Sequence, residues 1–252
     1  MKTIVYQSQA PSKLGGWMQR CCESVQAWAY DMDAEYRFLD DELFGYAERA
    51  LQEKFANQPV ILSDVARLRL MQSGLAEGYD RVIWCDADLL IFRPESLRLG
   101  TMPHAVGREV WVQWSADKLK SYRKVHNAFL MATSEDSFLP FYADSAEALL
   151  TAAEGPLVPQ FIGPKYLTAQ HNIRALHVQE DVGMLSPLAL ADIVREGGDA
   201  LRRMLEGHPQ GLNAVNLCAS YESRESDGVC NGTEDYHGAI DYLLAAGLSG
   251  LH

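Results

Sequence analysis

Apolar residues follow two patterns along this chain, short continuous runs and longer segments in which they recur at helical spacing. The short runs predict strands or extended segments at 3–6, 36–39, 82–84, 89–92, 104–114, 127–132 and 174–178. The recurring pattern predicts helices at 14–30, 41–55, 63–78, 134–153 and 187–205. A segment rich in proline and glycine, residues 154–164, is expected to be a loop beside a cleft. Strands alternating with helices are typical of an α/β fold.

Two carboxylates, Asp86 and Asp88, flank Ala87 at the point where the strand 82–84 should end. Open α/β sheets bind their ligands at such strand ends. Because adjacent carboxylates repel one another, a hard divalent cation with oxygen ligands, Mg²⁺ or Mn²⁺, is their natural partner, and a diphosphate can complete its shell. The alternative is a simple turn, since aspartate is common at strand ends.

A second pair of charged residues, Asp64 and Arg67, lies three positions apart near the predicted start of the helix 63–78. Ser63 or Asp64 can cap that start. Residues three apart share a helical face, so the pair could present an acid to a sugar hydroxyl and a guanidinium to a phosphate. The alternative is a cap with a surface ion pair.

The order of these motifs resembles the sugar-nucleotide-dependent glycosyltransferases of the GT-A fold, specifically family 32 and its toxin relatives, in which the paired aspartates form the DXD motif. Further segments are similar to that family: 4–8, 17–28, 35–42, 127–132 and 163–168. The resemblance implies an α/β fold of GT-A type, Rossmann-like, with a mixed central sheet flanked by helices and one domain spanning 1–252. The polar tail 207–252 is expected to form a C-terminal loop or lid over the donor.

The resemblance also implies an activity, the metal-dependent transfer of a sugar from a nucleotide-diphosphate donor, with a UDP-sugar favoured. The acceptor would be a glycan, a lipid-linked sugar or another small acceptor. Asp88 would hold Mn²⁺ or Mg²⁺ directly, while Asp86 would contact the ribose or share the metal through water. Asp64, Arg67 and Asn127 would contact the donor sugar and phosphate. An Asn satisfied by the backbone of its strand is the alternative for Asn127.

The base of the donor is expected at the end of the first strand, near Tyr6, Gln7 and Ser8. Tyr6 could stack on the base or belong to the core. Family members carry a histidine near the C-terminus that completes the metal or pyrophosphate site, and the matching position here is Asn216. An Asn carbonyl ligates hard cations more weakly than a carboxylate does, so the third ligand is either Asn216 or His237.

The stereochemical course is expected to be retention, as in the family that the chain resembles. An inverting enzyme would need a carboxylate base, and residues 180–181 could supply one. The alternative for these two acids is a solvated turn.

Composition narrows the choice of partners. The chain has 252 residues, enough for a sizeable core, and its 22 basic and 34 acidic residues give a net charge of −12, which disfavours duplex nucleic acid. No apolar stretch is long enough for a signal peptide or a membrane span, so the expected location is cytoplasmic. Five cysteines without paired spacing predict neither a disulfide framework nor a zinc site.

Two other classes of protein compete with this interpretation. Haloacid-dehalogenase-like phosphatases also place paired aspartates after an apolar strand, but their motif opens the domain and carries Thr or Val where this chain has Leu90. A non-catalytic sugar-nucleotide-binding protein on a decayed GT-A fold would share the features named above. It would bind a UDP-sugar without turnover.

Overall fold

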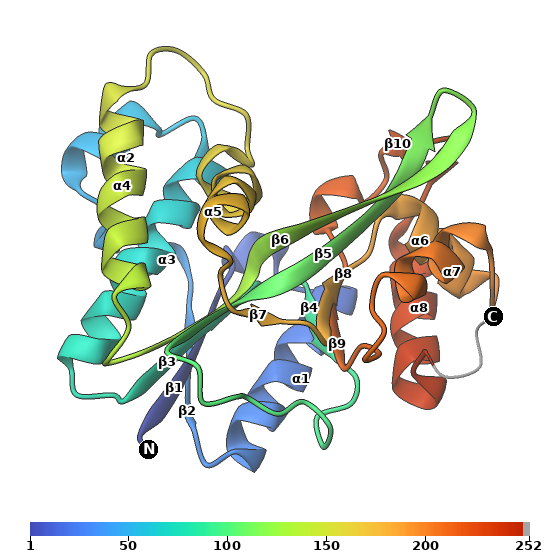
Figure 1. Cartoon of the computed structure of the whole chain (residues 1–252), viewed down its shortest axis with the longest axis horizontal. Helices are drawn as coiled ribbons and strands as arrows, with labels where there is room; N and C mark the ends of the chain where they lie inside the picture. Colours follow the sequence, from blue (N-terminus) through green and yellow to red (C-terminus); the bar gives the residue numbers. More distant parts are fainter. Residues whose placement is uncertain (249–252) are drawn as a thin grey trace.

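The central sheet of the protein has six strands in the order β2-β1-β3-β6-β5-β7 (Figure 1). We describe residues 1–248 of a computed structural model. Strand β1 pairs in parallel with β2 and β3, whereas β6 runs antiparallel to both β3 and β5. The predicted α/β fold with a mixed central sheet flanked by helices is therefore confirmed. The strands are β1 (Thr3–Ser8), β2 (Glu35–Leu39), β3 (Arg81–Cys85), β5 (His104–Ser115), β6 (Lys118–Thr133) and β7 (Val178–Gln179).

A smaller sheet of three strands joins the C-terminal part of the chain to the residues after β3. It is formed by β4 (Leu89–Ile91), β9 (Ala214–Asn216) and β8 (Val182–Met184), in that order. The antiparallel pairing of β4 with β9 sets Asn216 opposite Leu89. This register brings a position 128 residues away beside Asp88. Strands β10 (Glu225–Ser226) and β11 (Val229–Cys230) form a separate short hairpin.

Helices cover both faces of the central sheet (Figure 1). On one face α3 (Pro59–Ala76) buries Val65, Leu68 and Met71 in the same apolar cluster as Val82 and Trp84 of β3. On the other face α1 (Gly16–Asp31) packs against β4 and the neighbouring strands. The remaining helices are α2 (Arg49–Lys54), α4 (Phe138–Ala152), α5 (Tyr166–Arg174), α6 (Pro187–Val194), α7 (Asp199–Glu206) and α8 (Thr233–Ala246).

Two predicted helices have different limits in the structure. The helix expected at 41–55 is a 3-10 segment (Asp41–Tyr46) and α2, separated by extended backbone at Ala47 and Glu48. Helix α3 starts at Pro59, four residues before Ser63, because a proline at the first helical position fixes φ without losing a hydrogen bond. Asp64 therefore lies inside α3 and does not cap it.

The second half of the chain differs from the sequence-based expectation at residues 174–178 and in the tail. The strand expected at 174–178 is confined to β7, because α5 continues to Arg174 and Ala175 adopts a left-handed conformation with φ 48°. The tail from residue 207, expected to be a loop or lid, contains β9 and α8. Helix α8 buries Tyr236, Ile240 and Leu243 against α1 and α6, so much of the tail belongs to the core.

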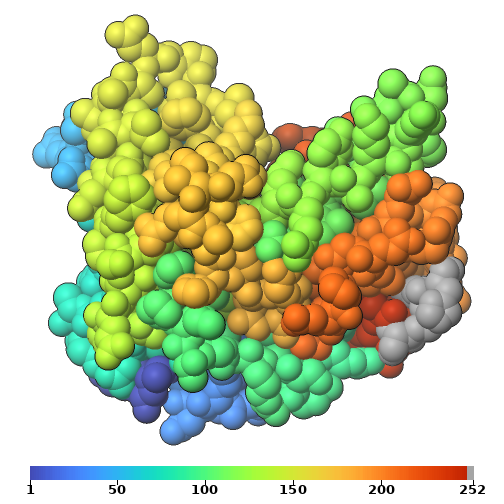
Figure 2. Space-filling model, viewed as in Figure 1, coloured from blue at the N-terminus to red at the C-terminus, as the bar shows by residue number. Residues whose placement is uncertain are grey.

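Beyond the central sheet, β5 and β6 continue as a long two-stranded hairpin, residues 108–125, which projects from the molecule (Figure 1). Figure 2 shows a hollow between this β5–β6 hairpin, in green, and the helical region 140–175, in yellow and light orange. Within residues 1–248, no helix is both long and apolar enough to span a membrane.

Candidate active site

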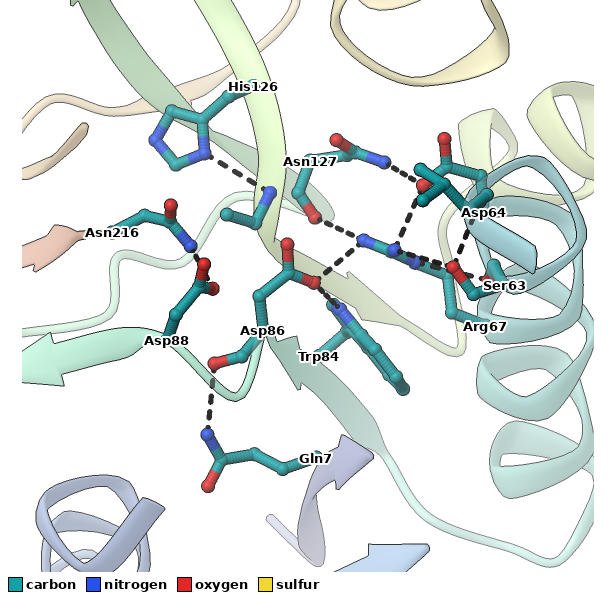
Figure 3. Close-up of polar contacts among 12 residues, drawn as sticks. Gln7, Ser63, Asp64, Arg67, Trp84, Asp86, Asp88, His126, Asn127 and Asn216 are labelled. Atoms are coloured by element: carbon teal, nitrogen blue, oxygen red, sulfur yellow. Dashed lines mark hydrogen bonds and ion pairs between the residues drawn. The ribbon is translucent and has the colours of Figure 1, made fainter. Parts of the chain in front are cut away.

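Asp86 directly follows β3 and is held by both its backbone and its side chain. Its amide nitrogen donates to the carbonyl of Ala128 at 2.8 Å, and its carbonyl accepts from Gln7 Nε2 at 3.0 Å. Its Oδ1 accepts from Arg67 Nη1 at 2.8 Å and from Trp84 Nε1 at 2.6 Å (Figure 3). The side chain remains 27% exposed. Asp86 is thus fixed at the carboxyl end of a central strand, with access from outside.

Arg67 is a buried cation that joins two carboxylates. Its Nη1 contacts Asp86 and also donates to the carbonyl of Asn127 at 3.1 Å, while its Nη2 lies 2.9 Å from Asp64 Oδ1. Its guanidinium carbon lies 4.8 Å from the centroid of the Trp84 ring. The side chains of Arg67 and Asp64 are only 7% and 5% exposed. A surface ion pair is therefore the wrong description of this pair.

Asp64 and Asn127 form a polar contact with one another, drawn above Arg67 in Figure 3. Asn127 Nδ2 donates to Asp64 Oδ1 at 2.8 Å, the same oxygen that faces Arg67. Asn127 is thus satisfied by a side chain and not only by its own strand. Burial raises the pKa of Asp64 to about 6, and Arg67 offsets only part of that effect. The buried carboxyl therefore binds its proton more tightly than an exposed aspartate does.

The backbone of Gly163 passes directly over this contact. A Cβ atom on Gly163 would lie 2.9 Å from both Asp64 Oδ2 and Asn127 Nδ2. Such distances are shorter than ordinary van der Waals contact, so the side chains of Asp64 and Asn127 would have to shift to admit a Cβ atom here. Gly163 forms a kink with non-helical backbone angles, φ −86° and ψ −116°, inside the helical segment Phe161–Lys165, and it lies in the region 154–164 that the sequence predicted as a loop.

Asp88 lies two residues beyond Asp86 and accepts hydrogen bonds on both oxygens. Asn216 Nδ2 donates to Oδ1 at 2.5 Å, and the amide of Ala219 donates to Oδ2 at 2.8 Å. No Lys, Arg or His within the described 248 residues forms an ion pair with Asp88. Burial, followed by the charge of Asp86, raises the pKa of Asp88 to about 6. Unlike Asp64 and Asp86, Asp88 has no internal cation beside it.

Asn216 reaches Asp88 through its amide nitrogen. Its Oδ1 accepts from the amide of Cys218 at 2.9 Å, so the carbonyl oxygen points away from Asp88. Asn216 would have to turn its amide to act as a metal ligand. The other expected third ligand, His237, lies on α8 next to Gly16, where a Cβ would be 3.5 Å from its Nε2. The structure therefore brings Asn216, and not His237, to Asp88.

Carboxylate oxygens suit hard divalent cations, and Asp86 and Asp88 fit such an ion chemically. Each oxygen of Asp88 keeps a second lone pair beyond the one it uses for a hydrogen bond. No group of three or more His, Cys, Asp or Glu that could hold a metal occurs in residues 1–248. A cation held by the two aspartates would therefore need further ligands from water or from a bound diphosphate.

The residues expected around the base have structural partners. Tyr6 is fully buried in the core beside α3, which rules out stacking on a base in this conformation. Gln7 is also buried and links Tyr36 to Asp86, and Ser8 Oγ donates to the carbonyl of Asp40 at 3.1 Å. Ala87 is buried, and its carbonyl is 3.5 Å from Cys22 Sγ. Of the expected base contacts, only Ser8 is partly exposed.

Glu180 and Asp181 form a turn between β7 and β8 and are engaged by other side chains. Glu180 pairs with Arg108 at 2.6 Å and with Arg123 at 2.9 Å. Burial alone would raise the pKa of Glu180, but the two arginines lower it overall. Asp181 accepts from Gln179 at 2.6 Å and from Asn213 at 2.7 Å. These contacts favour a structural role for Glu180 and Asp181 in the turn over a role as the base of an inverting reaction.

Trp84 and Gly163 are site residues whose roles the sequence reasoning missed. Trp84 stands two positions before Asp86, and side chains two apart on a strand lie on the same face, which was a usable signal. The approach of Gly163 to Asp64 depends on a fold in which distant segments meet. The sequence alone carried no sign of that contact.

No protein-family model matches the chain, and no curated protein matches its sequence. Among solved structures, the chain is similar to a glycosyltransferase involved in the glycosylation of the major capsid of PBCV-1, with a TM-score of 0.51 and 10% identity over 95% of this chain and 98% of that one. It is also similar to the galactosyltransferase LgtC in complex with donor and acceptor sugar analogues, with a TM-score of 0.48 and 14% identity over 95% of each chain. The first similarity shows that this chain has the GT-A glycosyltransferase fold.

Proposed function

We propose that this protein is a metal-dependent glycosyltransferase that moves a sugar from a nucleotide-diphosphate donor, with a UDP-sugar favoured, to an acceptor saccharide. One observation carries the proposal: at the carboxyl end of β3, Arg67 joins Asp64 to Asp86, while Asp88 has no ion pair with any side chain of residues 1–248. A GT-A fold surrounds this arrangement. The family 32 assignment remains a prediction that rests on the motifs.

Each residue of the site has a defined task in this proposal. Asp86 and Asp88 would hold the divalent cation, which offsets the negative charge that develops on the departing diphosphate. Asp64 and Asn127 would accept and donate hydrogen bonds to hydroxyls of the donor sugar, and because Arg67 and Asn127 both contact Asp64 Oδ1, Oδ2 would be the accepting oxygen. Arg67 fixes the positions of Asp64 and Asp86, because its nitrogens bind both.

Retention of the anomeric configuration is part of the proposal. An inverting reaction requires a carboxylate that takes the proton of the acceptor. The expected candidates for that base, Glu180 and Asp181, are occupied by arginine and amide partners. A retaining reaction needs no such base, since a phosphate oxygen of the leaving group can take the proton.

A second candidate function is sugar-nucleotide binding without turnover. The orientation of Asn216 favours it, because an amide nitrogen faces Asp88 where a metal ligand would be useful. Slow hydrolysis of the donor in the absence of an acceptor would separate the enzyme from the binding protein.

A thermal-shift experiment tests the proposal. Melting temperatures are measured with UDP, GDP, CDP and their sugars, each with Mn²⁺, with Mg²⁺ and with excess EDTA. A ligand at a hundred times its dissociation constant stabilises the folded state by about 2.7 kcal/mol, which corresponds to several degrees. Stabilisation that requires both a nucleotide and a cation is expected. If no nucleotide raises the melting temperature with either cation, the proposal is wrong.

A further inference from the structure

One face of the β5–β6 hairpin packs against helices over part of its length, and we call the other face the open face. Side chains alternate along a strand, so Val110, Val112 and Leu119 share a face, and all three belong to or pack against the apolar cluster formed with α6, α7 and α8. The open face carries the cross-strand pairs Trp111 with Tyr122, Gln113 with Lys120, and Ser115 with Lys118.

The open face is continuous with the active site. The amide of Ala219 donates to Asp88, and one turn of 3-10 helix leads from Ala219 to Tyr221. The ring of Tyr221 lies 5.4 Å from that of Trp111, between centroids. Trp111, Tyr122 and Tyr221 are all partly exposed. An aromatic surface thus starts beside Asp88 and extends along the hairpin.

Lysines flank this aromatic surface. Lys118, Lys120 and Lys124 lie on the open face of a chain whose net charge is −12. Lys124 is 3.3 Å from Glu109, but Lys118 and Lys120 are exposed and have no ion-pair partner in the part of the chain that the structure describes. Unpaired lysines on an acidic protein attract anions, which the negatively charged remainder of the surface repels.

We propose that the open face of the hairpin binds the acceptor, and that the acceptor is a saccharide carrying negative charge. Aromatic rings offer an apolar face to pyranose rings, and their edges tolerate polar neighbours. The two unpaired lysines select for a carboxylate or phosphate on the acceptor. This inference rests on the proposed function for its meaning as an acceptor site, although the binding surface can be tested alone.

The test compares an acidic and a neutral oligosaccharide of equal length, hexagalacturonate and maltohexaose. Their affinities are measured by calorimetry with the full chain in the presence of UDP and Mn²⁺, at low and high salt. We expect hexagalacturonate to bind at least about tenfold more tightly than maltohexaose, with the difference shrinking at high salt because exposed charges are screened. Equal affinities would overturn the inference, and so would no binding of hexagalacturonate.

Charge reversal locates the surface. The double variant Lys118→Glu with Lys120→Glu should lose at least about tenfold in affinity for hexagalacturonate and leave the nucleotide-dependent thermal shift unchanged. The matched control is Arg49→Glu on α2, a 90% exposed position away from the hairpin, which should bind as the wild type does. Wild-type affinity in the double variant would contradict the inference. Lysine-dependent binding to phosphatidylglycerol vesicles that exceeds binding to the saccharide would also contradict it, in favour of a membrane surface.

The same measurements separate this inference from the proposed function. If nucleotides bind but the acidic oligosaccharide is not preferred, the acceptor inference fails alone. If no nucleotide binds while hexagalacturonate still binds through the lysines, the glycosyltransferase proposal fails and the anionic-saccharide surface stands.

Discussion

Replacing Asp64 by asparagine should produce a protein that is more stable than the wild type and yet unable to hold its donor. Both partners of Asp64, Arg67 and Asn127, donate to the same oxygen, Oδ1. An asparagine can present its carbonyl oxygen there and keep both contacts. The amide nitrogen then replaces Oδ2 beneath Gly163, which removes the acceptor atom for a sugar hydroxyl.

The size of the stability gain follows from the pKa of Asp64. Burial is the main reason that this pKa is about 6 in the folded protein, whereas an unfolded aspartate has a pKa near 3.9. Asp64 therefore binds its proton more tightly in the folded state than in the unfolded state. Its contribution to the free energy of unfolding is fully present below about pH 4 and is lost as the pH rises through about 6. One pKa unit corresponds to about 1.4 kcal/mol, and the two pKa values differ by about two units. The free energy of unfolding of the wild type is therefore lower by about 3 kcal/mol at pH 8 than at pH 4 on account of Asp64. Asp64→Asn avoids this loss.

Melting temperatures measured in EDTA from pH 4 to pH 8 test this reasoning. For a chain of this size a gain of about 3 kcal/mol corresponds to about 6–12 °C at pH 8, and the two proteins should converge near pH 4. Asp144→Asn, at an exposed position on α4, is the matched control and should differ from the wild type by less than about 0.5 kcal/mol. A lower melting temperature for Asp64→Asn at pH 8 would show that the carboxylate stabilises Arg67 more than burial destabilises it. Normal donor binding would remove Asp64 from the site.

Three further substitutions test other parts of the site. Asp88→Asn should abolish the Mn²⁺-dependent rise in melting temperature, because the charge that offsets the cation is lost; an unchanged rise would place the cation elsewhere. Gly163→Ala should weaken donor binding in nucleotide titrations, since the new Cβ would meet Asp64 and Asn127. The control is Gly238→Ala, whose Cβ meets no atom within 4 Å and which should keep the wild-type affinity. Arg67→Met should lower the free energy of unfolding by about 3–5 kcal/mol in urea, because it leaves two carboxylates without their buried cation; a wild-type denaturation midpoint would contradict this.

Local patterns predicted most of the first half of the fold. Strand β3 and its acidic end were readable because an apolar run stops at two carboxylates, and helix α3 because its apolar residues recur at helical spacing. The start of α3 was misplaced, since Ser63 and Asp64 look like caps until Pro59 is recognised as the first helical residue. Helix α8 was missed because its sequence is interrupted by polar residues and Gly238, and its burial depends on α1 and α6.

The sequence named Asp64, Arg67 and Asn127 as candidates, but it did not show how the charges around them are arranged. Asp64, Arg67 and Asn127 were each expected to face a ligand, and the structure shows that they also bind one another. The contacts of Asn127 with Arg67 and Asp64 join positions 60 and 63 residues apart in sequence. The sequence could not show these contacts, because the residues of α3 and the residues at the strand ends become neighbours only when α3 packs on the sheet.

The distribution of charge within the site indicates where a cation is needed. Arg67 already neutralises Asp64 and Asp86, at 2.9 and 2.8 Å, whereas the partners of Asp88 are an amide side chain and a backbone amide, which carry no net charge. Burial raises the pKa of Asp88, so its ionised form is disfavoured until a positive charge arrives. Asp88 would therefore stabilise a bound divalent ion more than Asp86 would. Because the Asp86 side chain is partly exposed and held in a fixed position, it can serve as the second contact to that ion or to the donor. Asp88 is the residue on which metal binding should depend.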